Sequence, residues 1–109
     1  MATLKKKDIL KKLAKIDKSK YSILELGLFG SYVRDEATEN SDIDIIVKME
    51  LKKGMYQNFC NLHRELESIF DKKVDLIDKA VFDYKFKNEN VREYKEKVKN
   101  EILGSVIYV

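Results

Sequence analysis

A glycine–serine pair between two apolar segments is the feature that most constrains how this chain can fold. Residues 22–29 (SILELGLF) and 42–49 (DIDIIVKM) are rich in aliphatic side chains and predict two buried strands. Gly30 and Ser31 follow the first segment directly, and glycine allows the backbone to turn sharply there. The residues after this pair predict a short helix over Tyr32 to Thr38, which leads through a turn to the second strand.

Hydrophobic spacing predicts the remaining elements and the faces of the first strand. Leu24, Leu26 and Leu28 should share one face of that strand, with Ile23 and Phe29 on the other. The further elements are a helix from Thr3 to Ile16, a helix from Met55 to Phe70, a tight turn at Asp71 to Lys73, a strand from Val74 to Asp78, a charged helix within Asp83 to Leu103 that Gly104 ends, and a last strand or apolar tail from Ser105 to Val109. This order predicts an α/β fold with a small sheet, and the pattern alone leaves open whether the sheet is parallel or mixed.

Size and composition predict a soluble single-domain protein. The 109 residues suit one domain spanning 1–109, with 44% hydrophobic and 38% charged residues. No apolar run is long enough to cross a membrane, and the single cysteine, Cys60, cannot form an internal disulfide, which favours a reducing, cytoplasmic location. A net charge of +3 is too small to argue for direct nucleic-acid binding. The lysines of the first helix lack interleaved aromatic residues, so we interpret that face as solvated.

The Gly30–Ser31 turn has two interpretations. It can be a plain turn in which Ser31 caps the following helix. Alternatively, the glycine lets the backbone approach a ligand, Ser31 donates its hydroxyl to a phosphate, and the start of the helix favours the anion. The carboxylates that follow favour the second interpretation.

Asp42 and Asp44 lie two residues apart on the second predicted strand, and therefore on the same face. Two neighbouring carboxylates repel each other unless a cation neutralises them, and Mg²⁺ prefers carboxylate, water and phosphate oxygens. A strand start also tolerates exposed aspartates, which is the alternative. Asp75 is the candidate for a third carboxylate, because its short apolar strand can pair beside the Asp42–Asp44 strand. Asp78, at the end of that strand, is the competitor and is more typical of a cap or turn residue.

Three further residues have weaker signals. Arg34 can steady a phosphate through its planar guanidinium, or it can be a surface residue paired with Asp35 or Glu36. His63 is the single histidine, and we interpret it as a surface or half-buried residue of a helix with no obvious partner. Cys60 is interpreted as a packing residue.

The run Leu28-Phe29-Gly30-Ser31-Tyr32-Val33-Arg34, followed by Ser41-Asp42-Ile43-Asp44, resembles the minimal nucleotidyltransferases of the polymerase-β-like superfamily. Their motif is Gly-Ser, ten residues and Asp-x-Asp, with a later aspartate on a neighbouring strand, which Val74-Asp75-Leu76 resembles. The resemblance covers residues 23–77 and implies the small α/β nucleotidyltransferase fold, with a short mixed sheet flanked by helices. One departure is Asp35, where family members often have glycine.

The resemblance also implies an activity. Such proteins are typically encoded beside a HEPN-domain RNase toxin and act as its antitoxin by transferring AMP from ATP to a toxin tyrosine. By this resemblance, Asp42, Asp44 and Asp75 are the catalytic residues and hold two Mg²⁺ ions, while Gly30, Ser31 and Arg34 bind the nucleotide. The expected partners are the cognate toxin and ATP, and we expect assembly either into a homodimer or into a hetero-oligomer.

Three alternatives remain open at this point. The chain can be a non-catalytic antitoxin that masks its partner by binding, although binding alone has no need of three carboxylates. It can be a small-molecule nucleotidyltransferase of the antibiotic-modifying type, which usually carries an additional helical domain. A DNA-binding regulator is the weakest alternative, because the sequence has no clear helix-turn-helix signal and the charge is modest.

Overall fold

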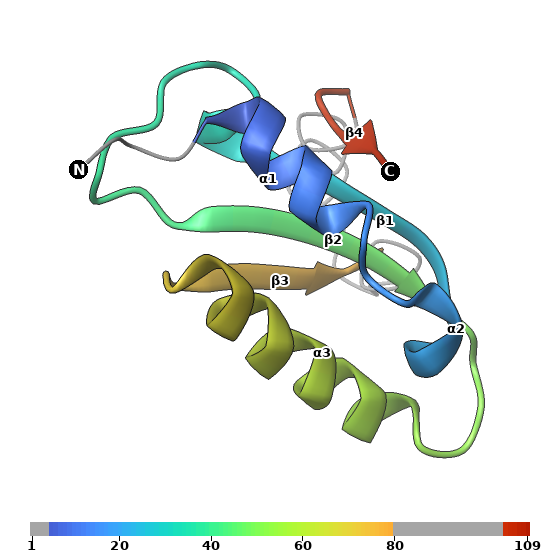
Figure 1. Cartoon of the computed structure of the whole chain (residues 1–109). Coiled ribbons are helices and arrows are strands. Elements are labelled where there is room, and N and C mark those ends of the chain that lie inside the picture. Colours follow the sequence, from blue (N-terminus) through green and yellow to red (C-terminus); the bar gives the residue numbers. More distant parts are fainter. Residues whose placement is uncertain (1–4, 80–103) are drawn as a thin grey trace, which may run out of the picture.

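A four-stranded mixed sheet is the centre of the fold (Figure 1). The computed structural model describes residues 5–79 and 104–109. In chain order, the elements are α1 (Lys6–Leu13), α2 (Lys18–Tyr21), β1 (Ile23–Phe29), the 3₁₀ turn η1 (Gly30–Tyr32), β2 (Ile43–Met49), α3 (Met55–Phe70), β3 (Val74–Asp78) and β4 (Ile107–Tyr108). The strand order is β3-β2-β1-β4, in which β1 is antiparallel to both neighbours and β2 is parallel to β3. The predicted α/β class is confirmed, and the sheet is mixed.

Helix α3 and strand β3 have the bounds that the sequence predicts, Met55–Phe70 and Val74–Asp78. Gly54 precedes the helix with a φ of 88°, and Asp71 ends it in the left-handed conformation. Because β2 and β3 are parallel, the chain needs a crossover to return to the same end of the sheet, and α3 supplies it. This crossover is what places β3 beside β2.

The core lies between one face of the sheet and the helices α1 and α3, which cover that face together (Figure 1). Along β2, alternate side chains point to this core, because successive residues of a strand point to opposite faces. The buried residues of the core cluster are Ile9, Leu13, Ile16, Tyr21, Ile23, Leu26, Leu28, Tyr32, Ile43, Ile45, Val47, Met49, Leu62, Leu66, Phe70 and Val74. The other face of β2 therefore carries Asp44, opposite Phe29 of β1.

The N-terminal helix is shorter than predicted. Within the described residues, α1 ends at Leu13, and a second short helix, α2, follows. The side chain of Asp17 caps α2 by accepting a hydrogen bond from the backbone N–H of Lys20 at 3.2 Å. The hydroxyl of Tyr21 donates a hydrogen bond to Glu65 and so connects α2 to α3. Burial, and to a smaller extent this hydrogen bond, raise the pKa of Tyr21 to about 12. The Asp17 cap was the local signal for a new helix start.

The predicted faces of β1 are wrong at its start. The pairing of β1 with β2 shifts register between Ile23 and Glu25, which is the signature of a β-bulge. As a result Ile23 lies in the core, whereas Leu24 is 58% exposed. Leu26 and Leu28 do share the core-facing side, as predicted. A bulge inverts the alternation for the residues before it, and the hydrophobic pattern of the segment does not reveal it.

The helix predicted over Tyr32 to Thr38 is also wrong, because the chain forms only the 3₁₀ turn η1 there. The carbonyl of Gly30 accepts hydrogen bonds from the N–H groups of Val33 and Arg34, at 3.1 and 3.2 Å. Asp35 then adopts a left-handed φ of 59°, which ends any helical run. So short a segment cannot offset the unfavourable nucleation of a helix. Because this helix does not form, Ser31 does not act as the helix cap that the first interpretation of the turn predicted.

The C-terminal segment forms a strand, as one of the two predicted alternatives. Strand β4 pairs antiparallel with β1, with Tyr108 opposite Gly27, and the N–H of Val109 donates to the carbonyl of Leu26 at 2.9 Å. The helix predicted within residues 83–103 lies outside the described residues. Among the helices of residues 5–79 and 104–109, none is long and apolar enough to span a membrane.

Candidate functional site

The register of β2 and β3 brings the predicted carboxylates to one face of the sheet. Asp44 is paired directly with Asp75 across the two strands. Successive side chains of a strand point to opposite faces, so residues two apart share a face. Asp42 precedes Asp44 by two residues and therefore lies on the same face as this pair. Asp78 follows Asp75 by three residues and therefore lies on the opposite, core-facing side. The geometry therefore favours Asp75 over Asp78 as the third carboxylate.

Asp44 is the most electrostatically perturbed of these groups. Burial raises the pKa of Asp44 above its ordinary value of 3.8, and the carboxylates of Asp75 and then Asp42 raise it further, while Arg34 acts in the opposite direction. Burial and like charge both disfavour the ionised form. A cation beside Asp44 would reverse this penalty, so the site is electrostatically prepared to accept one.

Gly30 lies directly against Asp44. A Cβ atom added at Gly30 would meet Oδ2 of Asp44 at 2.1 Å, and Gly30 has a φ of 81°. Both the close contact and the positive φ require glycine at this position. The turn after β1 therefore lies in contact with the carboxylate that the motif predicts as a metal ligand. Ser31 follows within η1 and is half-buried.

The donor set fits Mg²⁺ by its chemistry, because three carboxylates on one face offer the hard oxygen ligands that this ion prefers. Within residues 5–79 and 104–109, however, no three acidic, histidine or cysteine side chains form a ready metal cluster. Oδ2 of Asp42 is instead paired with Nζ of Lys73 at 3.8 Å. For Asp42 to bind the same ion as Asp44 and Asp75, the exposed ion pair between Asp42 and Lys73 has to break.

Arg34 and Asp35 have surface partners in the structure. Nε of Arg34 lies 3.1 Å from Oε2 of Glu36, which matches the surface pairing weighed for it, although its charge still opposes the pKa shift of Asp44. Asp35 is exposed, and its carboxylate lies 3.7 Å from Nζ of Lys6 in α1. The left-handed φ of Asp35 is a conformation that glycine adopts without strain, which agrees with the glycine that the family resemblance implies here. The carboxylate of Asp35 is therefore paired with α1.

Comparison with known proteins assigns the chain to a family. A family model described as a nucleotidyltransferase domain covers residues 10–109. A putative protein adenylyltransferase of Methanocaldococcus jannaschii is 41% identical over 88 residues, which are 80% of this chain and 88% of the relative. The chain belongs to the nucleotidyltransferase domain family. The protein adenylyltransferase MntA of Thermococcus cleftensis is 33% identical to this nucleotidyltransferase over 92 residues, 84% of this chain and 80% of the relative.

Solved structures show the same fold. A crystal structure of a toxin–antitoxin with AMP-PNP contains a chain that is similar to this nucleotidyltransferase with a TM-score of 0.54 and 23% identity, over 94% of this chain and 71% of that one. A structure of the tri-AMPylated Shewanella oneidensis HEPN toxin in complex with MNT antitoxin gives a TM-score of 0.54 and 21% identity, over 92% and 67%. At these identities the likeness establishes the fold, and the fold implied by the sequence resemblance is confirmed.

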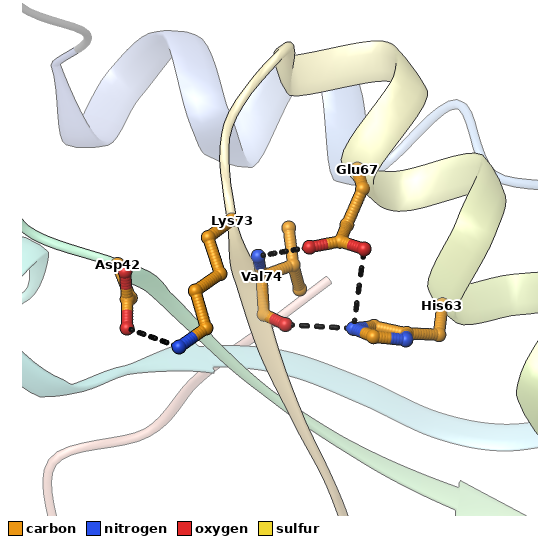
Figure 2. A network of polar contacts seen from close by, with 5 residues as sticks. All are labelled: Asp42, His63, Glu67, Lys73 and Val74. Atoms are coloured by element: carbon orange, nitrogen blue, oxygen red, sulfur yellow. Dashed lines mark hydrogen bonds and ion pairs between the residues drawn. The ribbon is translucent and has the colours of Figure 1, made fainter.

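A network of polar contacts holds the edge of β3 beside the carboxylates of this nucleotidyltransferase (Figure 2). The carbonyl of Lys73 accepts from the N–H of Ile43 in β2, so the N–H and carbonyl of Val74 point away from β2. Glu67 Oε2 accepts the Val74 N–H at 3.1 Å, and His63 Nε2 donates to the Val74 carbonyl at 2.8 Å. Two side chains of α3 thus satisfy both outward backbone groups of one β3 residue.

His63 is half-buried on α3, as predicted, and the structure gives it partners. His63 Nε2 also lies 3.7 Å from Oε1 of Glu67, four residues along the same helix. That spacing was the signal in the sequence for an interaction within α3. The contact with Val74 depends on the packing of α3 against β3 and had no signal in the sequence.

We expect His63→Ala to lower the free energy of unfolding by about 1–2 kcal/mol, because the carbonyl of the buried Val74 loses its donor. Denaturant unfolding followed by circular dichroism measures this change. Arg64→Ala, at an exposed neighbouring position of α3, is the control and should change stability by less than about 0.5 kcal/mol. Equal stability of the two variants would show that the hydrogen bond does not hold β3.

Proposed function

We propose that this nucleotidyltransferase is a Mg²⁺-dependent protein adenylyltransferase that transfers AMP from ATP to a tyrosine of a HEPN-domain toxin, and so acts as its antitoxin. The observation that carries the proposal is the pairing of Asp44 with Asp75 on the face where Gly30 contacts Asp44. Paired carboxylates next to a glycine turn suit a triphosphate with its metal ions and have no role in simple masking. The names of the relatives, protein adenylyltransferases among them, support the reaction class.

At phosphorus, the reaction forms one bond and breaks one, and the proton of the attacking hydroxyl is transferred as well. The phenolic oxygen of the tyrosine bonds to the α-phosphorus of ATP, the bond from that phosphorus to the bridging oxygen breaks, and diphosphate leaves. Asp42, Asp44 and Asp75 would hold Mg²⁺, which when bound neutralises charge on the phosphate oxygens. A carboxylate oxygen of Asp75, the most exposed of the three, accepts the proton of the attacking hydroxyl. Gly30 lets the triphosphate approach the backbone, and Ser31 donates its hydroxyl to a phosphate oxygen.

The partner is proposed from the structural neighbours. Those solved structures are toxin–antitoxin complexes, one with AMP-PNP and one with an AMPylated HEPN toxin and an MNT antitoxin. A HEPN-domain protein is therefore the partner class to test. Arg34 stays a predicted nucleotide-binding residue, for which release from Glu36 would be required.

The test is transfer of label from α-labelled ATP. The purified chain is incubated with Mg²⁺ and the nucleotide, with and without a candidate HEPN-domain protein, and Asp42→Asn is run in parallel. We expect label on a tyrosine of the HEPN protein with the wild-type chain and none with the variant. Tight binding of the partner without any label would favour a masking antitoxin, and label on a small molecule alone would favour a different transferase.

A further inference from the structure

The register of β2 and β3 places Lys73 beside Asp42 on the face that carries the carboxylates. Asp44 pairs with Asp75, and the same register continued by two residues toward the start of both strands sets Asp42 opposite Lys73. The hydrogen bond from the N–H of Ile43 to the carbonyl of Lys73, at 3.1 Å, shows that the two strands are still joined at this position. The face therefore carries a two-by-two array of charged side chains, in which three are carboxylates and the fourth is an ammonium.

The ammonium of Lys73 neutralises Asp42 in the structure (Figure 2). Nζ of Lys73 lies 3.8 Å from Oδ2 of Asp42, and within residues 5–79 and 104–109 this carboxylate is its sole acidic partner. The sheet fixes the backbone of Lys73, but its side chain is 75% exposed, so packing does not hold the ammonium in place. An exposed ion pair of this kind is weak, and a ligand that offers either charge a better partner can break it.

Mg²⁺ and Lys73 compete for the carboxylate of Asp42. Both are cations, so an ion that binds Asp42 has to displace the ammonium and then lies close to a like charge. Binding of the free ion is therefore weaker than the three carboxylates alone would allow. The displaced ammonium also loses its partner, unless the ion arrives with an anion attached.

A phosphate group supplies that new partner. Each Mg²⁺–oxygen distance is about 2 Å, so the other oxygen ligands of an ion at Asp42 lie within about 4 Å of that carboxylate. Nζ of Lys73 reaches this distance from Asp42 already. Asp42, Lys73 and Asp75 are also among the residues that line a pocket of about 300 Å³ between α3 and β3, the α3–β3 pocket, which leaves room for the side chain to move. Lysine binds phosphate as a point charge and needs no fixed orientation to do so.

We propose that Lys73 couples the binding of Mg²⁺ to the binding of the nucleotide. Its ammonium pairs with Asp42 when no ion is bound, and it moves to a phosphate oxygen of the nucleotide when Mg²⁺ takes its place. This inference rests on the function proposed above and adds to it a nucleotide-binding residue that favours the metal–nucleotide complex over the free ion. By linkage, each of the two ligands then tightens the binding of the other.

The first measurement is the affinity for free Mg²⁺, titrated into the isotope-labelled chain and followed by NMR at the backbone amides of β2 and β3. We expect Lys73→Gln to bind Mg²⁺ roughly 2- to 5-fold more tightly than the wild type, which is the range of one exposed ion pair. Lys72→Gln is the matched control, because Lys72 carries the same charge one residue away and donates instead to the carbonyl of Glu39. This control should bind Mg²⁺ as the wild type does.

The second measurement is the affinity for α,β-methylene-ATP at saturating Mg²⁺, by calorimetry and without an acceptor protein. The methylene bridge prevents transfer of AMP, so the titration reports binding alone. We expect Lys73→Gln to bind this nucleotide roughly 5- to 10-fold more weakly than the wild type, the range of one charged contact to phosphate. Lys73→Arg keeps the charge and should restore both affinities, whereas Lys72→Gln should change neither.

Three outcomes would overturn the proposal: an unchanged affinity of Lys73→Gln for either ligand, changes of equal size in Lys72→Gln, and a wild type that binds neither ligand. Equal changes in the two glutamine variants would indicate a general effect of charge. If no label reaches a HEPN protein, the proposed function fails, whereas these titrations still decide what Lys73 does. If label is transferred and Lys73→Gln binds both ligands as the wild type does, the proposed function stands and this inference fails.

Discussion

Gly30→Ala is expected to abolish AMP transfer and to destabilise the fold, because two separate constraints meet at this position. The φ of 81° is a left-handed conformation, in which a residue with a Cβ atom loses about 1–2 kcal/mol. The new Cβ would also lie 2.1 Å from Oδ2 of Asp44 and 2.9 Å from its Cγ, so the carboxylate must move. Because displacement of a reacting group by about 1 Å can reduce a rate 100-fold, we expect a loss of roughly that size or more.

Gly54→Ala separates the two effects. Gly54 has a similar φ of 88°, but a Cβ added there would meet no atom within 4 Å. This variant should lose a similar amount of stability through its backbone and keep normal transfer activity. Thermal unfolding and label transfer are measured for both variants side by side. If Gly30→Ala is as active as Gly54→Ala, the contact between Gly30 and Asp44 has no role in the reaction.

Asp44→Asn is expected to reduce transfer roughly 1,000-fold while making the metal-free protein more stable. Metal coordination at the reacting oxygens is worth several kcal/mol, and each 1.36 kcal/mol is a factor of ten in rate. The opposite effect on stability follows from the pKa of Asp44, which burial, Asp75 and Asp42 raise above 3.8. The folded state therefore resists ionisation of Asp44, and asparagine removes that unfavourable charge.

The pH dependence of this gain has a definite sign. A carboxyl whose pKa is raised in the folded state binds its proton more tightly there than in the unfolded chain, so its contribution to stability is present at low pH and lost as pH rises through the folded pKa. The advantage of Asp44→Asn should therefore be largest at neutral pH and vanish below about pH 3.8. Melting temperatures of both proteins across this range, without metal, measure it.

The control for this second prediction is Glu39→Gln, which removes an exposed carboxylate from the turn before β2 and should change neither activity nor stability. Mg²⁺ with ATP should raise the melting temperature of the wild type and of Glu39→Gln, but much less that of Asp44→Asn. If the wild type still melts at a lower temperature than Asp44→Asn when Mg²⁺ and ATP are present, the assignment of Asp44 as a metal ligand is contradicted.

Local sequence patterns were sufficient for the parts of this nucleotidyltransferase whose structure depends on neighbours along the chain. The apolar stripe of α3 and the short run of β3 predict their bounds correctly, because periodicity records which face each element buries. The pattern from Gly30 to Asp44 and the family resemblance likewise needed only the order of residues. The similarity to known proteins establishes the family and the fold. It does not test individual residues, so the catalytic and binding roles of these residues stay predictions.

Tertiary structure alone decided the features that depend on how strands and helices meet. The bulge that turns Ile23 inward, the direct pairing of Asp44 with Asp75, and the hydrogen bond from His63 to Val74 all depend on how separate elements pack. The same is true of the α3–β3 pocket, which exists because the parallel crossover sets α3 against the edge of β3. Sequence determines which side chains can bind a nucleotide and metal, since that is a property of their chemistry. Register and packing determine which of them meet, because distances between strands arise only when the sheet is assembled.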